Sequence, residues 1–332
     1  MRIGRPASGG RVLSAIGFRS RRTTVGLDIG SGFNKAVVMD HARNAPRLAR
    51  VAIAPNAEGT VVAGAIRDPD RVAESLASMF ARGGIAQREV VIGVSGRDVM
   101  SKLIEVDRMD EEEARAAIPW EAEQHVPFDM EAVQLDFVIT DPSGEGPTMT
   151  VLLAAAKREL IETRVSLLRR AGLIPVAVDV EALALHNALE ANYPGAMQGV
   201  TGLVDVGAEA TTVHVLADGV PVLARDLGIG TGGLSGDDVT PRAGRIANGI
   251  ERAGAFVEAG GFGLGLARLF LCGGGVAASG LSDLLAQRLG VETHVANALE
   301  RLDVGPDVAD RTDLGDVAPM LMLSVGLALR RP

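Results

Sequence analysis

Two stretches of the chain share one order of elements: a strand, a glycine turn and a second strand. The first runs from Thr24 to Met39 and turns at Gly30-Ser31-Gly32, and the second runs from Thr201 to Ala217 and turns at Gly207. Because a strand flanks each turn on both sides, the pattern predicts two β-hairpins. A P-loop or a Rossmann glycine loop opens a helix instead, so neither is indicated.

The rest of the pattern alternates strands with helices, which predicts an α/β fold. Pro119 should bend the helix that contains it, and the Gly- and Asp-rich segment 231–244 indicates a loop. Strands are expected at 90–94, 101–106, 133–139, 148–156, 176–179, 221–226 and 269–272, and helices at 70–82, 110–124, 160–170, 181–190, 245–258, 281–289 and 318–330.

Composition narrows the class of protein. The chain has 332 residues, of which 47% are hydrophobic, enough for about two packed domains. A net charge of −9 argues against a nucleic-acid binder, which needs a basic face. Cys272 is the only cysteine, so no intramolecular disulfide can form, and the five histidines show no metal-ligand spacing.

The N-terminus is basic, with six arginines before residue 23 and no acid until Asp28. It lacks the features of a secretory signal, and the longest uncharged apolar run, 269–281, is far short of the ~20 residues that span a bilayer. Two interpretations of residues 1–22 stay open: a disordered basic arm, or a patch that binds an anionic membrane surface.

The Asp-x-Gly turns indicate a chemistry. Glycine lets the backbone approach a ligand closely, and the exposed N–H groups of such a turn suit a phosphate. An aspartate before the turn can hold Mg²⁺ through water. One such turn is most simply a tight hairpin. Two of them, followed by a strand and Gly273-Gly274-Gly275, indicate a clamp around a nucleotide.

These motifs resemble the actin/Hsp70/sugar-kinase superfamily. VGLDIGSGFNKAVV (25–38) and LVDVGAEATTVHVL (203–216) resemble its two phosphate motifs, and LFLCGGGVAASGL (269–281) its adenosine motif. Within the superfamily the chain is most similar to the PilM family. Segments 118–139, with its WEAEQ…PF stretch, 151–189 and 324–331 resemble this family's inserted module and terminal helix.

The resemblance implies a two-domain actin-like ATPase fold with an inserted FtsA/PilM-type β-β-α-β-β-α subdomain. The implied organisation is a basic arm (1–22), domain I (23–200) with the insert at about 89–156, domain II (201–317) with a shortened subdomain, and a terminal helix (318–332). Trp120, in the insert helix, is expected to be buried.

The resemblance also implies a site for ATP and Mg²⁺. Asp28 and Asp205 would hold Mg²⁺ through water. Glu181 would orient the attacking water, although a carboxylate that only stabilises a helix N-terminus is an equal alternative. The residues that would contact the phosphates are Gly30, Ser31, Gly32, Lys35, Gly207, Ala208 and Thr211, and those that would border the adenine are Gly273, Gly274 and Gly275.

Two departures from the family pattern point to weak nucleotide binding and little ATPase activity. Phe33 stands where the family has a small hydroxyl residue near the phosphates. Between Gly230 and Leu269 the chain lacks an additional helix that walls the ribose and adenine in relatives.

By resemblance, the protein is a scaffold of type IV pilus assembly, peripheral on the cytoplasmic face of the inner membrane. It would bind the cytoplasmic N-terminal tail of a PilN-like bitopic inner-membrane protein, between domain I and the insert, and contact other pilus inner-membrane and motor components. The alternative is an FtsA-like membrane-associated cytoskeletal ATPase, although the chain shows no amphipathic helix after the terminal helix. A sugar or acetate kinase is a third option, with no catalytic base indicated beyond Glu181.

Overall fold

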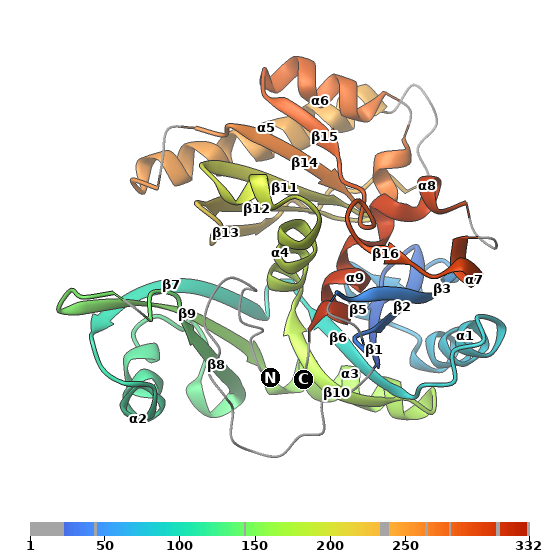
Figure 1. Ribbon diagram of the computed structural model, residues 1–332, viewed down its shortest axis with the longest axis horizontal. Helices are drawn as coiled ribbons and strands as arrows, with labels where there is room; N and C mark the ends of the chain where they lie inside the picture. The colour runs from blue at the N-terminus through green and yellow to red at the C-terminus, as the bar shows by residue number, and fades with distance from the viewer. Residues whose placement is uncertain are drawn as a thin grey trace.

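The computed structural model describes residues 23–42, 45–142, 144–232, 239–262, 265–278, 280–309 and 313–330. The predicted basic arm, residues 1–22, lies outside these ranges, as do residues 233–238 of the loop after Gly230 and the last two residues. In Figure 1 a five-stranded sheet lies above a six-stranded sheet, and a small three-stranded sheet lies beside them.

The six-stranded sheet, called here the first sheet, has the order β10-β6-β1-β2-β3-β16. β1 and β2 form the first predicted hairpin, β3 continues it antiparallel, and β6 and β10 are parallel to β1. The bounds are β1 Thr23–Ile29, β2 Phe33–Asp40, β3 Arg47–Pro55, β6 Glu89–Val94, β10 Ile174–Val180 and β16 Asp303–Val304, with a two-stranded ribbon of β4 Val61–Val62 and β5 Ala65–Ile66 after β3.

Helices cover both faces of the first sheet. Side chains alternate between the faces of a strand, so Leu27 of β1 packs with Leu76 of α1 (Pro69–Arg82) and Leu167 of α3 (Arg158–Arg170). On the other face lie α4 (Glu181–Asn192) and α9 (Met322–Leu329). α9 crosses β1 at Gly26, where any Cβ would clash with the Ser324 carbonyl, so only glycine allows this approach. The terminal helix is thereby fixed on the first sheet.

The five-stranded sheet, called here the second sheet, has the order β13-β12-β11-β14-β15. Its outer face is covered by α5 and α6, and its inner face packs on α4, which lies between the two large sheets in Figure 1. The bounds are β11 Val200–Val206, β12 Thr211–Ala217, β13 Val220–Asp226, α5 Val239–Ala259, β14 Arg268–Cys272, α6 Leu281–Leu289 and β15 Glu292–Val295.

The chain returns to the first sheet before the terminal helix. β16 pairs with β3 of the first sheet, so this return precedes residue 317, which we predicted as the end of domain II. Two short helices and a 3₁₀ turn then lead into α9: α7 Pro306–Ala309, α8 Leu314–Val317 and the turn Ala318–Leu321.

The inserted module is built on the small sheet, β7-β9-β8, with α2 packed on it. We predicted that it would begin at about residue 89, but residues 89–94 form β6, which pairs with β1 and β10 in the first sheet. The module therefore begins with β7. Its bounds are β7 Val99–Asp107, α2 Glu111–Ala122, β8 Val133–Ile139 and β9 Thr148–Lys157.

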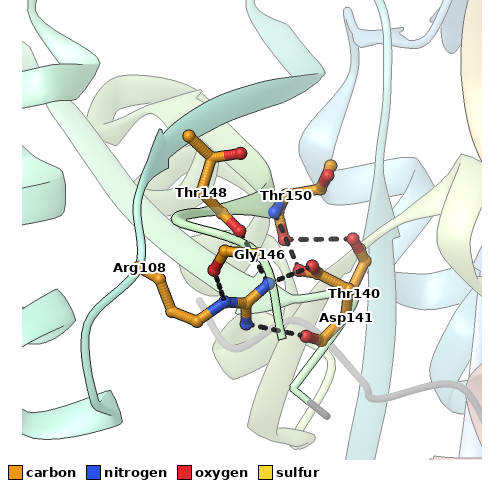
Figure 2. Close-up of polar contacts among 6 residues, drawn as sticks. All are labelled: Arg108, Thr140, Asp141, Gly146, Thr148 and Thr150. Carbon is orange, nitrogen blue, oxygen red and sulfur yellow. Dashed lines mark hydrogen bonds and ion pairs between the residues drawn. The ribbon is translucent and has the colours of Figure 1, made fainter. Parts of the chain in front are cut away.

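The chain enters and leaves the module at neighbouring residues, Asp98 and Lys157. The backbone N–H of Lys157 donates to the carbonyl of Asp98 at 3.0 Å, and the two side chains form an ion pair of 2.6 Å. At its far end, Arg108 holds the β8–β9 turn by donating to Asp141 (2.7 Å) and to the carbonyls of Gly146 and Thr148, as Figure 2 shows. The Asp98–Lys157 contacts thus close the base of the module, and the Arg108 contacts hold its far turn together from within.

Trp120 is not buried as we expected: 74% of its surface is exposed. The inner stripe of α2 consists of Ala114, Ile118 and Ala122, four residues apart. Trp120 follows Ile118 by two residues, about 200° around the helix, and so points away from the small sheet.

Candidate functional site

The first glycine turn places an acid and a base side by side. Asp28 at the end of β1 pairs in register with Lys35 of β2, so both side chains lie on the same face. Lys35 Nζ is 2.6 Å from Asp28 Oδ2. The turn is closed by the Gly30 N–H, which donates to the Phe33 carbonyl at 3.1 Å.

The second glycine turn is closed in the same way. The Gly207 N–H donates to the Ala210 carbonyl at 2.8 Å, and Asp205 precedes the turn as Asp28 does in the first. The loop after Gly230 braces this turn, because the Thr231 N–H donates to the Gly207 carbonyl (3.0 Å) and the Gly232 N–H to the Ala208 carbonyl (2.7 Å).

The triple glycine follows β14 and packs against the second turn. Gly273 has φ +90°, and a Cβ there would clash with the Asp205 carboxylate and the Val206 carbonyl. A side chain at this position would therefore disturb both the backbone and the acid.

A cavity of about 320 Å³ brings these elements together. Phe33 also lines it and is 43% exposed. Thr211 is the exception among the predicted residues: it is completely buried, and Thr212, the next residue of β12, lines the cavity instead. The predicted residues that do line the cavity are Asp28, Gly30, Ser31, Gly32, Lys35, Glu181, Asp205, Gly207, Ala208, Gly273, Gly274 and Gly275.

Burial raises the pKa of two carboxyls in the lining, where acids also outnumber bases. Burial, together with the nearby charge of Asp28, raises the pKa of Glu181 to about 7. Burial also raises the pKa of Asp205 to about 6, although Lys35 acts in the opposite direction. Burial alone would lower the pKa of Lys35, but Asp28 raises it above its ordinary value. The carboxylate residues in the lining are Asp28, Glu181, Asp205, Glu209 and Asp226, and the cations in it are Lys35 and Arg164.

This donor set fits a hydrated magnesium ion. Among the residues that the structure describes, no three His, Cys, Asp or Glu side chains are grouped to hold a metal directly. Mg²⁺ keeps several waters and needs only one or two carboxylates. Two carboxylates, the buried Asp28 and the partly buried Asp205, lie beside glycine turns that suit phosphate and match that requirement.

Sequence reasoning missed several residues of the cavity. Arg164 of α3 lies in the apolar stripe with Leu160, Leu167 and Leu168, and a charge in such a stripe is the signal that could have found it. Glu209, Met320 and Leu323 gave no such signal. The other lining residues outside the prediction are Ile29, Ala63, Gly64, Ser95, Gly96, Ala210, Asp226, Thr231 and Gly232.

The segment between β13 and β14 is where the sequence predicts the loss of a helix beside the ribose and adenine. Between β13 and β14 the described residues contain a single helix, α5, which begins at Val239 rather than at the predicted residue 245. Met320 and Leu323, from the segment that leads into α9 and from α9 itself, line the cavity together with the triple glycine.

In the described part of the chain, no helix is long and apolar enough to cross a membrane.

Two sheets that each begin with an Asp-x-Gly hairpin and share a glycine-lined cavity define an actin-like two-domain fold. The chain belongs to the family described as type IV pilus assembly protein PilM, whose model matches residues 26–239 and 235–332. The fold class and the family indicated by the sequence motifs are thereby confirmed.

Solved structures agree with this assignment. The chain is 28% identical in sequence to a chain of a PilM-PilN type IV pilus biogenesis complex. The match covers 94% of this chain and 99% of that chain, and the two superpose with a TM-score of 0.79. The ethanolamine utilization protein EutJ from Carboxydothermus hydrogenoformans is 16% identical, with 99% and 92% covered and a TM-score of 0.50. The second likeness concerns the fold alone.

Proposed function

We propose that the protein is a scaffold of type IV pilus assembly that docks a PilN-like inner-membrane protein and binds a magnesium nucleotide. The observation that supports this proposal is the match, along nearly the whole chain, to the PilM family and to a chain of a PilM-PilN complex. The protein then lies on the cytoplasmic face of the inner membrane, held there by the partner's N-terminal tail, and contacts other inner-membrane and motor components of the pilus.

The tail docks between the inserted module and the rest of the chain. A second cavity, of about 180 Å³, supports this placement because β7 contributes Val99, Met100 and Ser101 to it, while Val180 and Ala182 line it from the first sheet and α4. The strands β12 and β13 close its remaining side. α2 covers the other face of the small sheet, so Trp120 lies away from this second cavity.

A pull-down from membranes tests the docking. The full chain should recover a bitopic protein with a short cytoplasmic tail, and a variant in which Asp98 is joined to Lys157 by a short glycine linker should not. In cells that lack this partner, the protein should leave the membrane fraction. Unchanged membrane recovery in those cells would instead assign the location to residues 1–22.

The cavity between the two sheets binds ATP with Mg²⁺, and the affinity is weak. Gly30, Ser31, Gly32 and Lys35 contact the phosphates from one side, and Gly207, Ala208 and Thr212 do so from the other. Asp28 and Asp205 hold the hydrated Mg²⁺, which offsets the excess of acids, and Gly273, Gly274 and Gly275 border the base. Calorimetry with Mg-ATP tests this, and Lys35→Ala should weaken binding at least tenfold, since it removes a charge-assisted hydrogen bond.

Turnover is slow because Phe33, which stands where the family has a small hydroxyl residue, lines the cavity and offers the phosphates no hydrogen-bond donor. The pKa of Glu181, raised by burial to about 7, suits a general base at neutral pH, and its partial protonation costs only about twofold. Because Glu181 would act on water rather than hold the phosphates, Glu181→Ala should leave nucleotide affinity almost unchanged. An ATPase rate typical of a cytoskeletal motor would favour the FtsA-like alternative instead.

A further inference from the structure

Arg164 is a buried arginine whose charge has no anionic partner within the described structure. Its side chain lines the nucleotide cavity although only 5% of the residue is exposed. One of its nitrogens, Nη2, donates to the carbonyl of Gly64 at 2.8 Å. A neutral carbonyl is the weaker kind of acceptor for a guanidinium.

The other buried cations near the first sheet are paired differently. Lys35 has Asp28 at 2.6 Å, and Arg330, equally buried, has Asp179 at 3.2 Å. No carboxylate of the described residues forms such a pair with Arg164, and burying an unpaired charge is costly. Burial lowers the pKa of Arg164, and the more distant charges of Glu181 and Asp28 offset this only in part. Arg164 therefore presents a guanidinium that an added anion would neutralise.

The position of Arg164 indicates which part of a nucleotide this anion is. The carboxylates whose charges act on Arg164 are Glu181 and Asp28. The triple glycine, where the base would lie, packs instead against Asp205. Arg164 therefore lies with Glu181, Asp28 and the β4–β5 turn, whereas the triple glycine lies with Asp205.

We propose that Arg164 binds the terminal phosphate of a nucleoside triphosphate and makes the cavity prefer a triphosphate to a diphosphate. This inference rests on the proposed nucleotide site and adds its specificity. A guanidinium has five donors in a planar fork that matches phosphate oxygens. With Nη2 bound to Gly64, the remaining donors are available to a phosphate, so the fork would join the ligand to the β4–β5 turn.

The test compares ATP and ADP by calorimetry, both with Mg²⁺. The unmodified protein should bind ATP at least tenfold more tightly than ADP. Arg164→Gln should remove this preference, by weakening ATP at least tenfold while changing ADP less than threefold. Arg164→Lys keeps the charge but loses the fork, so its loss should be intermediate. Arg108→Gln, in the distant cluster of Figure 2, is the matched control and should leave both affinities unchanged.

The outcomes separate this inference from the nucleotide function. Equal affinity of the unmodified protein for ATP and ADP overturns the role of Arg164, whether or not the variant folds. A variant that folds, by its circular dichroism and melting temperature, and loses ATP and ADP equally overturns it too. Binding of neither nucleotide by the unmodified protein contradicts the nucleotide site itself.

Discussion

Glu209 Oε2 accepts a hydrogen bond of 2.5 Å from the backbone N–H of Ala63, a residue 146 positions earlier in the chain. Glu209 belongs to the second glycine turn, and Ala63 lies at the tip of the β4–β5 turn beside the first sheet. Both line the cavity between the two large sheets, where we propose that the nucleotide binds. The contact therefore joins the two sides of the cavity directly.

Removing this contact should loosen the β4–β5 turn. Glu209→Ala should accelerate amide hydrogen exchange at residues 60–66 several-fold, because a hydrogen bond to a charged group contributes about 1.5–3 kcal/mol and this one is partly screened by solvent. Glu209→Gln keeps an oxygen acceptor in the same place and is the control. If both variants exchange like the unmodified protein, the contact does not hold the turn.

His214 should make the protein sensitive to mild acid. It is 5% exposed, neither ring nitrogen has a hydrogen-bond partner in the described structure, and burial lowers its pKa to about 4. Between pH 6.5 and 4 the unfolded chain binds a proton at this histidine and the folded chain does not. Neutral His214 therefore does not lower the free energy of unfolding above about pH 6.5. As the pH falls below this value, the free energy of unfolding decreases, by about 2 kcal/mol at pH 5.

Urea unfolding at pH 7.5 and pH 5 measures this loss. His214→Phe cannot titrate, so it should lose about 2 kcal/mol less than the unmodified protein between these two pH values. The comparison cancels the opposite effect of Glu181 and Asp205, whose raised pKa values favour the folded state as the pH falls. His125→Phe, at a half-buried position after α2, is the control. Parallel losses in all three proteins would assign acid sensitivity to other groups.

The sequence predicted local features well, because they depend on residues that are close along the chain. Both hairpins and the triple glycine were found from turn chemistry, and the aspartates before the turns followed from them. Features set by distant pairing were missed. Nothing within residues 89–94 reveals that β6 pairs with β1 and β10, and the partner of Arg164 lies 100 positions away. At Thr211-Thr212 two identical residues gave no clue to which one faces the cavity.

Excising the inserted module should be tolerated only at its true boundaries. Asp98 and Lys157 are already in contact, so joining them by a short glycine linker replaces the module with a turn. This variant should fold with reduced stability, because Val180, Ala182 and Leu183 lose their packing against the small sheet. Deletion of 89–156 also removes β6 from the first sheet and should yield no folded protein. Circular dichroism and thermal melting separate these outcomes, and equal behaviour of the two deletions would contradict the boundary.

At the end of the cavity that would hold the base, Met320 lies with the triple glycine, and its Cε is within contact distance of a Cβ built at Gly274. Two polar side chains also pack against these glycines, but Asp205 is assigned to Mg²⁺ and the Thr231 hydroxyl donates to the Gly207 carbonyl. Apolar contacts stabilise any base, whereas discrimination between bases needs polar groups that match one edge. We therefore expect Mg-ATP and Mg-GTP to differ less than tenfold in affinity.

Met320→Ala should weaken ATP and GTP equally. Loss of about 50 Å² of apolar contact costs on the order of 1.3 kcal/mol, or roughly tenfold in affinity. Phe256→Ala, at an exposed position of α5, removes a larger apolar side chain away from the cavity and should change neither affinity. Calorimetry with both nucleotides decides the point. A clear preference for ATP that Met320→Ala leaves intact would mean that polar groups outside this lining discriminate between the bases. It would also contradict the prediction that the part of the site beside the adenine is missing after Gly230.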